Sequence, residues 1–247
     1  MGAVNRDVSA VFNDLQSAWS GVRSAIAKLG TGTDIRPNNV AAVFGVDARV
    51  DGGVRITAGP IVFHVPEKPS SSGAELYVVL SGWLVLSPKP DHEQKRYTRQ
   101  FGTKVGYFRQ KGAELTHVYG THYDMDEQLP GHPVFHAQMC SQAGFAEHIA
   151  AEYHTTFGAP LDLSEGLLAN VRTPTAQMDV FSVITQIGAD HFVSETSAPE
   201  IRRAFGDLRS ACDFFYGAAG QLSYLNEPPA SQCYRSTHWY ERSASAD

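Results

Sequence analysis

The chain has few cysteines, no long apolar run and no low-complexity tract. Its three cysteines among 247 residues, Cys140, Cys212 and Cys233, are widely spaced and include no CxxC pair. This usage is typical of proteins in a reducing cytoplasm and gives no zinc-finger pattern. No apolar run approaches the ~20 residues that a membrane-spanning helix needs. We therefore expect a soluble cytoplasmic protein without a membrane span.

An excess of basic charge is also missing. The chain carries 20 Lys and Arg against 26 Asp and Glu, which gives a formal net charge of −6 and a pI near 5.9. This balance argues against a protein that coats nucleic acid through a broad basic field, although a nuclease with a local basic groove is compatible with it. The first segment, MGAVNRDVSAVFNDLQ, contains acids and lacks an apolar core, so no secretory signal is expected there.

Residues 4–29 have the periodicity of one long amphipathic helix. Apolar side chains recur at spacings of four and three, and Gly30 follows the last of them, where helices commonly end. We expect this stripe to pack on the protein's own sheet, because its two aromatic residues suit a broad surface better than a coiled-coil seam. Oligomerisation through such a seam is the alternative. The stripe is formed by Val8, Phe12, Leu15, Trp19, Val22, Ile26 and Leu29.

Between about residues 38 and 140 the sequence has the texture of strands. Four segments there are rich in β-branched and aromatic residues and are separated by clusters of Gly, Pro, Ser and Asp. They are VRITAGPIVFHV, AELYVVLSGWLVLS, KRYTRQFGTKVGYFRQ and ELTHVYGTHYDMD. Their succession predicts an antiparallel meander of five or six strands, with the first helix across one face.

The periodicity of helices returns over residues 142–220. Thr173 before Pro174 predicts one helix start, and Ser197 with Glu200 matches the capping box of another. The second of these helices has its apolar side chains on one side, and these are Ile201, Ala204, Phe205, Leu208 and Cys212.

Together these segments predict an α+β fold with the C-terminal helices packed on the sheet. No internal repeat and no charged run marks a linker, so residues 1–241 are expected to form a single domain. The last residues, 242–247, have the composition of a disordered tail.

Three of the ten histidines lie in one short segment, HYDMDEQLPGHPVFHAQ, residues 122–138. We interpret it as two strands joined by a loop over residues 127–131, where Pro130 and Gly131 provide turn chemistry. Because side chains on a strand alternate between its faces, polar and apolar residues separate almost completely. The polar face would carry His122, Asp124, Asp126, His132, Val134, His136 and Gln138, and the apolar face Tyr123, Met125, Pro133, Phe135, Ala137 and Met139.

A symmetric pairing around this loop sets His122 opposite His136 and Asp124 opposite Val134. Directly opposed side chains approach to ~5 Å between their Cβ atoms. Two imidazoles and a carboxylate would then share one small patch. Pro133 cannot donate to a ladder and belongs at a strand start, an edge or a bulge, which leaves the register open by one residue.

Three interpretations of this patch compete. It can be the polar outer surface that antiparallel sheets often present. It can be an acid–base site in which His122 and His136 exchange protons and Asp124 orients one of them, since imidazoles titrate near neutrality. It can also be a divalent metal site, because two histidines and one carboxylate suit iron, zinc or manganese.

Other residues are candidates for accessory roles. Asp126, His132 and Gln138 share the polar face and are expected to contact a substrate. Arg109 lies in a stretch where basic and aromatic residues alternate, a pattern that can bind single-stranded nucleic acid. Cys140 follows Gln138 by two residues, so it shares the parity of the polar face, and a thiol beside an imidazole can become a nucleophile.

The segment HYDMDEQLPGHPVFHAQ, followed by VRTPTAQMDVFSVI, resembles a pattern in bacterial toxin and defence proteins. The shared features are a tyrosine–aspartate strand, a His-Pro step, a second histidine and a later Pro-Thr step. Part of it is similar to the TumE-like toxin components of toxin–antitoxin pairs, which act on RNA. The resemblance covers about residues 115–185 and implies a bacterial toxin or defence setting. The corresponding region of those toxins is more basic.

The combined expectation is a cytoplasmic hydrolase of phosphodiester bonds, with RNA as one substrate. His122 and His136 would be acid and base, Asp124 would orient them, and a divalent metal ion could be bound by the same three residues. Two alternatives remain open. One is a non-catalytic interaction module of a defence or toxin–antitoxin complex, with another protein of that system as partner. The other is a Cys140-dependent transferase resembling ubiquitin-conjugating folds, which have a similar helix-then-meander order.

Overall fold

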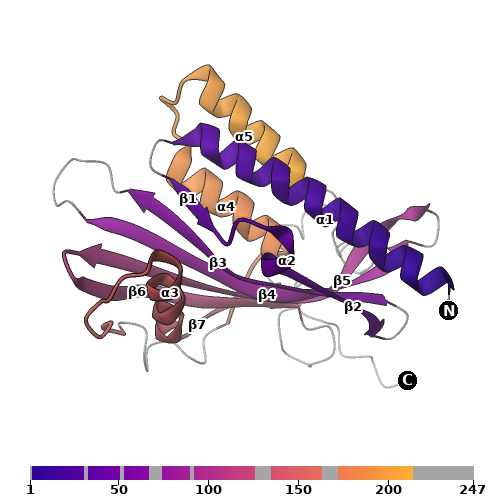
Figure 1. Cartoon of the computed structure of the whole chain (residues 1–247), viewed down its shortest axis with the longest axis horizontal. Helices are drawn as coiled ribbons and strands as arrows, with labels where there is room; N and C mark the ends of the chain where they lie inside the picture. The colour runs from indigo at the N-terminus through magenta and orange to yellow at the C-terminus, as the bar shows by residue number, and fades with distance from the viewer. Residues whose placement is uncertain are drawn as a thin grey trace, which may run out of the picture.

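The computed structural model describes residues 2–30, 33–50, 53–66, 74–89, 92–125, 135–162 and 172–213. They form one antiparallel sheet flanked by helices (Figure 1). The predicted loop at residues 127–131, its neighbours Asp126 and His132, and the predicted tail at 242–247 lie outside the described residues. Among the described residues, no helix is both long and apolar enough to cross a bilayer.

The sheet has eight strands in the order β1-β3-β4-β5-β6-β7-β8, and β2 pairs beside β1 with β3. The strands are β1 (Asp34–Arg36), β2 (Phe44–Val50), β3 (Gly53–Pro66), β4 (Glu75–Lys89), β5 (His92–Lys111), β6 (Glu114–Met125), β7 (Phe135–Met139) and β8 (Arg172–Pro174). The predicted α+β fold with an antiparallel sheet is confirmed. The sheet exceeds five or six strands because β1 and β8, of three residues each, pair with β3 and β7.

One face of the sheet is covered by the helices α1 (Gly2–Leu29) and α4 (Val180–Phe192), and α5 (Pro199–Cys212) packs on these two helices (Figure 1). Five residues of the predicted stripe are buried: Leu15, Trp19, Val22, Ile26 and Leu29. Val8 and Phe12 are only half-buried, and Val11 is buried beside them. The Trp19 ring meets Phe44 edge to face at 5.6 Å. The expectation that this helix packs on its own sheet is confirmed. A dimer seam would have to use a surface that is already covered.

Among the described residues, the other face is covered by α3 (Ala146–Tyr153), which follows a short 3-10 turn (Ala143–Phe145). A smaller apolar cluster lies beneath α3, with Phe108 and Ile149 at its centre. The remaining helix, α2 (Val40–Val43), is a single turn before β2. The two faces therefore differ in cover, and the more open one carries the polar residues of β6 and β7.

Of the two predicted helix starts, the one at Pro174 is wrong, and the other is found at Pro199 but without its predicted cap. The helix expected from Pro174 begins at Val180, because residues 172–174 pair with β7 and Asp179 accepts hydrogen bonds from the amides of Phe181 and Ser182. The capping box at residues 197–200 is not formed. Ser197 instead accepts a hydrogen bond from the amide of Ser194, so α5 begins without a side-chain cap.

Candidate metal centre

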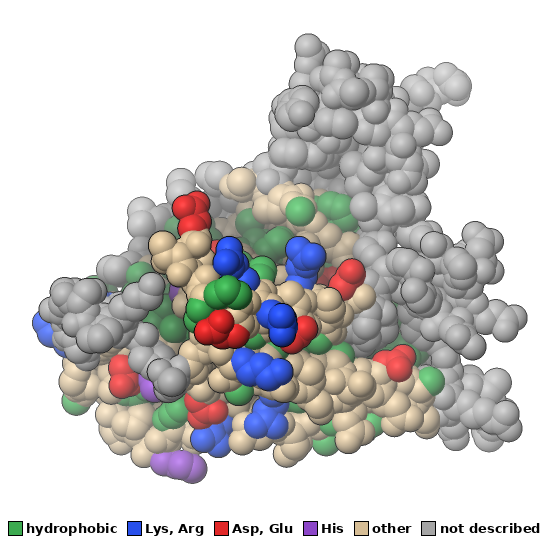
Figure 2. Space-filling view, turned by 90° about the horizontal axis from the view of Figure 1, so that it is seen from above, with side chains coloured by type: hydrophobic (Ala, Val, Ile, Leu, Met, Phe, Trp, Pro, Cys, Tyr) green, Lys and Arg blue, Asp and Glu red, His purple; other side chains and the backbone are tan. Residues whose placement is uncertain are grey.

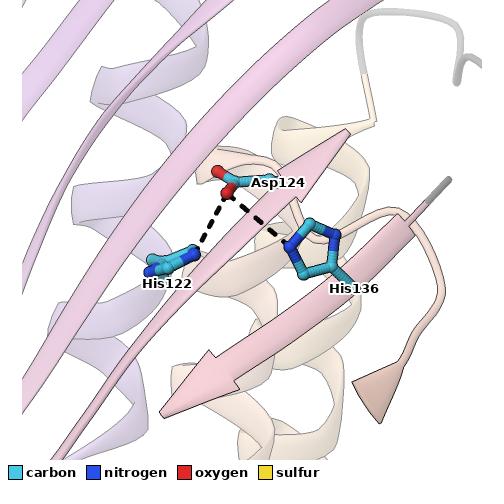
Figure 3. Close-up of side chains that lie close together, drawn as sticks. All are labelled: His122, Asp124 and His136. Carbon is cyan, nitrogen blue, oxygen red and sulfur yellow. Dashed lines mark ion pairs between the residues drawn. The ribbon is translucent and has the colours of Figure 1, made fainter. Parts of the chain in front are cut away.

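Three polar side chains from β6 and β7 converge on the open face of the sheet (Figure 3). His122 Nε2 lies 3.1 Å from Asp124 Oδ2, and His136 Nε2 lies 3.8 Å from the same oxygen. The two imidazole rings are nearly perpendicular, with centroids 6.1 Å apart. One carboxylate oxygen therefore lies between two imidazole nitrogens.

The strand register that produces this cluster differs from the expected one by two residues. Asp124 is opposite His136 and His122 is opposite Gln138, whereas the sequence predicted His122 opposite His136. A shift of two residues keeps every side chain on its face, so the three residues still meet. The shift is consistent with β7 starting at Phe135, after Pro133, which has no amide hydrogen for a ladder.

The alternation of faces agrees with the prediction on both strands. Tyr123, Met125 and Phe135 are buried in the large core beneath the helices, while the histidines and Asp124 point the other way. Met139, expected in the same core, is only half-buried. The apolar partners thus hold β6 and β7 against the core, and this packing fixes the positions of the polar side chains behind them.

The three polar residues differ in depth. His136 is 2% exposed, the side chain of His122 is 24% exposed and that of Asp124 is 41% exposed. The cluster is therefore closed beneath His136 and opens to solvent beside Asp124. A small molecule or water can approach the carboxylate side without displacing the core.

Hydrogen bonding holds His122 in its charged form in the absence of a metal. Its contacts with Asp124 and then with Cys140 raise the pKa of His122 to about 9, against the smaller effect of burial, which lowers it. Cys140 follows β7, and its amide donates to the carbonyl of Gly120. Gln142 Nε2 donates to Cys140 Sγ at 2.9 Å. The expected closeness of Cys140 to an imidazole is thus found.

Residues on neighbouring strands extend this face. Lys104 on β5 is directly opposite His122 and exposed, so a cation lies one strand away from the cluster. Trp83 on β4 is opposite Gly102, which is itself opposite Asp124. A Cβ on Gly102 would lie 2.8 Å from Trp83 Nε1 and 3.4 Å from Asp124 Oδ1. Glycine therefore leaves the space in which Trp83 and Asp124 approach each other.

An arginine also reaches this region. The guanidinium carbon of Arg55, on β3, lies 4.9 Å from the centre of a Trp83 ring. Sequence reasoning did not select Arg55, Trp83 or Lys104, because their place beside the cluster depends on the pairing of β3, β4 and β5. Alternation within each strand gives its two faces but not which strands are neighbours.

Other predicted residues are placed as follows. Gln138 is opposite His122 and half-buried, so it borders the cluster. Arg109 is opposite Leu76, which packs against the core beneath the helices, and so lies on the other face of the sheet. The structure does not bring Arg109 to the histidines. Asp126 and His132 lie outside the described residues.

A second histidine–aspartate pair lies under α3. His117 is completely buried, and its Nδ1 is 2.9 Å from Asp162 Oδ1. Residues 117 and 162 also form an isolated β-bridge, so this pair fastens a later segment of the chain to β6. Its burial and the backbone bridge favour a structural role.

The spacing of the three ligand atoms suits a metal ion. They lie within 4.8 Å of one another. A tetrahedral zinc site with bonds of about 2.0–2.1 Å places its ligand atoms about 3.4 Å apart. The distances from Asp124 Oδ2, 3.1 Å to His122 and 3.8 Å to His136, lie on either side of this value. The whole set spans up to 4.8 Å, so the side chains would have to draw closer together around an ion. Two histidines and one carboxylate leave at least one position open for water or substrate.

Charge elsewhere on the surface is mixed. Seen from above, over α1 and α5, basic and acidic side chains are interspersed (Figure 2). On α5 the exposed residues of both signs are Glu200, Arg202, Arg203, Asp207 and Arg209. This side therefore does not present a field of one sign to nucleic acid.

Comparisons with known proteins indicate no function for this chain. The chain matches no protein-family model, no curated protein and no solved structure.

Proposed function

We propose that the protein is a metal-dependent hydrolase of phosphodiester bonds, with His122, Asp124 and His136 as its metal ligands. The observation that carries this proposal is the convergence of the three ligand atoms within 4.8 Å on the less covered face of the sheet. A divalent ion bound there supplies a Lewis acid and an activated water at neutral pH.

The burial of His136 favours metal binding over a pure acid–base pair. A general base must reach the proton that it removes, directly or through one water. A metal ligand need not touch the substrate, and deep ligands beside more exposed ones hold an ion with its open positions toward solvent. His136, at 2% exposure, fits the ligand role better than the base role.

The surrounding charge and rings support an anionic, ring-containing substrate. Lys104 lies across from His122, where its ammonium group can pair with a phosphate. Trp83, with Arg55 over it, provides an aromatic and cationic surface on the same face. Base stacking on aromatic rings and phosphate pairing with cations are the interactions by which proteins hold single-stranded nucleic acid. RNA is therefore the first substrate to test.

The experiment measures hydrolysis of a chromogenic bis-aryl phosphate, single-stranded RNA and single-stranded DNA by metal-free protein. We expect activity only after Zn²⁺ or Mn²⁺ is added, and loss by at least 100-fold in His136→Ala. The control variant is His148→Ala, which removes a half-buried histidine from α3 and should retain activity.

Two outcomes contradict the proposal. If the metal-free protein is fully active, the ion has no role, and the acid–base interpretation gains. If metal binds to the wild type but none of the three substrates is cleaved, the face is a binding surface, which is the interaction-module alternative. Metal content of the purified wild type and His136→Ala, measured by mass spectrometry, separates the second case from a misfolded preparation.

A second candidate is thiol chemistry, because Cys140 contacts His122, which in turn contacts Asp124. A thiol, an imidazole and a carboxylate in series are the parts of a nucleophilic site. Cys140→Ser distinguishes the two candidates. If the metal carries out the reaction, Cys140→Ser keeps the turnover of the wild type. If Cys140 is a thiolate, iodoacetamide labels the wild type at neutral pH, and this labelling depends on His122. The toxin or defence setting stays a prediction from the resemblance.

A further inference from the structure

A cavity lies on the helix-covered side of the sheet, away from the histidine cluster. It measures about 400 Å³ and is bounded by β4, β5, β6 and the C-terminal half of α4. The residues that decide its chemistry are Tyr107, Tyr119, Tyr123, Gln186, Asp190 and His191. Three aliphatic side chains complete the wall. We call it the tyrosine pocket. Its volume lies within the range of small-molecule sites, about 300–1,000 Å³.

Aromatic rings form most of the wall. The rings of Tyr107 and Tyr119 meet at 63° with centroids 5.8 Å apart, and Tyr107 meets the His191 ring at 5.7 Å. Tyr123 lies four residues after Tyr119 on β6 and is buried. All three tyrosine rings line this open pocket, and the face of an aromatic ring carries negative potential.

The charge of the pocket is negative. Asp190 is an exposed residue of the pocket wall. Burial, followed by the neighbouring Tyr119 and Asp190, raises the pKa of Tyr123 to about 12. Burial lowers the pKa of His191, so this imidazole is neutral at pH 7. No lysine or arginine is among the described residues that line the pocket. One carboxylate is therefore left without a cation inside the pocket.

We propose that the tyrosine pocket binds a small organic cation, a protonated or quaternary amine. The ammonium group lies against the tyrosine faces and beside Asp190, and the ligand's carbon atoms contact the aliphatic side chains. Cation–π attraction and one carboxylate are the features by which proteins recognise alkylammonium groups. An anionic ligand is disfavoured by Asp190, and a neutral apolar one leaves the three phenol groups unused.

This inference does not depend on the proposed hydrolase activity. The pocket and the metal centre lie on opposite faces of the sheet, and the pocket residues are not metal ligands. We therefore expect His136→Ala, which lacks one proposed metal ligand, to bind the amine as metal-free wild type does, whichever way the activity test falls.

The test compares two ligands of nearly equal shape. Choline and its uncharged carbon analogue, 3,3-dimethylbutan-1-ol, are titrated into the full-length protein, and binding is followed by isothermal calorimetry and by NMR shifts of the ligand methyl groups. We expect choline to bind at least tenfold more tightly than the alcohol. Equal affinity for the two, or binding of neither, overturns the proposal.

Variants locate the site. Tyr119→Leu removes one half-exposed ring and should weaken choline binding about 3- to 30-fold, the range expected for one cation–π contact. Asp190→Asn should weaken it about tenfold while leaving the alcohol unaffected. Tyr119→Phe keeps the ring and retains binding, and Asp207→Asn, an exposed carboxylate on α5, is the charge control. If Asp207→Asn weakens binding as much as Asp190→Asn, the effect is one of net charge and the pocket assignment is wrong.

Discussion

The two faces of the sheet use the same strands for different purposes. Beneath the helices α1, α4 and α5, the side chains are mostly apolar, and this layer contains the larger of the two hydrophobic clusters. On the other face, α3 is the covering helix within the described part of the chain, and the cluster of His122, Asp124 and His136 is partly open to solvent. Burial on the first face stabilises the strands, and the strands in turn fix the positions of the polar side chains on the second face.

This comparison explains how the polar side chains can be held in fixed positions although their own ion pairs add little to the free energy of folding. Each residue of the cluster has a buried chain neighbour on the opposite face, such as Tyr123 beside both His122 and Asp124. Burial of an aromatic side chain contributes roughly 1.5–3 kcal/mol, whereas a partly exposed ion pair contributes about 0–1 kcal/mol. Mutations on the two faces should therefore affect different properties.

The largest effect is expected on the covered face. Phe135→Ala empties a buried site where the ring stacks on Phe101 at 6.1 Å, and it should lower the free energy of unfolding by about 3–5 kcal/mol. Urea denaturation checks this value. Val118→Ala, at an exposed position of β6, is the control and should change stability by about 0.5 kcal/mol or less. A wild-type transition in Phe135→Ala would mean that β7 is not anchored in the core.

A smaller effect is expected from metal on the open face. Saturating Zn²⁺ should stabilise the wild type by about 2.7 kcal/mol when its free concentration is 100 times the dissociation constant. Thermal melts with and without metal measure the shift. His136→Ala should show no shift, and His148→Ala should shift like the wild type. Equal shifts in all three proteins would place the ion elsewhere.

The next effect concerns pH in the metal-free protein. The pKa of His122 is raised in the folded state from 6.5 to about 9, so protonation favours folding. Its contribution is fully present below about pH 6.5 and is lost as the pH rises through 9. We expect it to be on the order of 1–2 kcal/mol, because solvent screens the exposed carboxylate of Asp124.

Stability measured from pH 6 to 10 in wild type and His122→Gln isolates this contribution. The difference between the two proteins should shrink across that window. A difference that grows with pH would reverse the assigned sign.

The smallest effect on stability is expected at Gly102. A methyl group there would lie 2.8 Å from Trp83 Nε1, so Gly102→Ala should displace the indole and cost about 1 kcal/mol or less. It should nevertheless weaken substrate binding on the open face, because Trp83 and Asp124 then separate. Gly112→Asn, at a turn with φ of 61°, is a glycine control that leaves this face unchanged. Unaltered substrate affinity in Gly102→Ala would remove Trp83 from the site.

The sequence predicted which face each residue of β6 and β7 occupies, because strict alternation and the contrast of Tyr123 and Phe135 with Asp124 and His136 depend only on local geometry. It did not predict the register, since a shift of two residues leaves that contrast unchanged. The helix start at Val180 was missed because Thr173 and Pro174 also resemble a helix start. In the structure these two residues pair with β7, and Asp179 caps the helix instead. The place of Lys104 beside the cluster and the existence of the tyrosine pocket could not be predicted, because both depend on which strands pair with one another.

The alternation along β6 also links the two sides of the molecule. His122, Tyr123 and Asp124 are consecutive, so two proposed metal ligands and one wall of the tyrosine pocket belong to a single stretch of backbone. A ligand that shifts this stretch from either side changes the binding free energy on the other. Linkage then requires reciprocity: the factor by which an amine alters the affinity for metal equals the factor by which the metal alters the affinity for the amine.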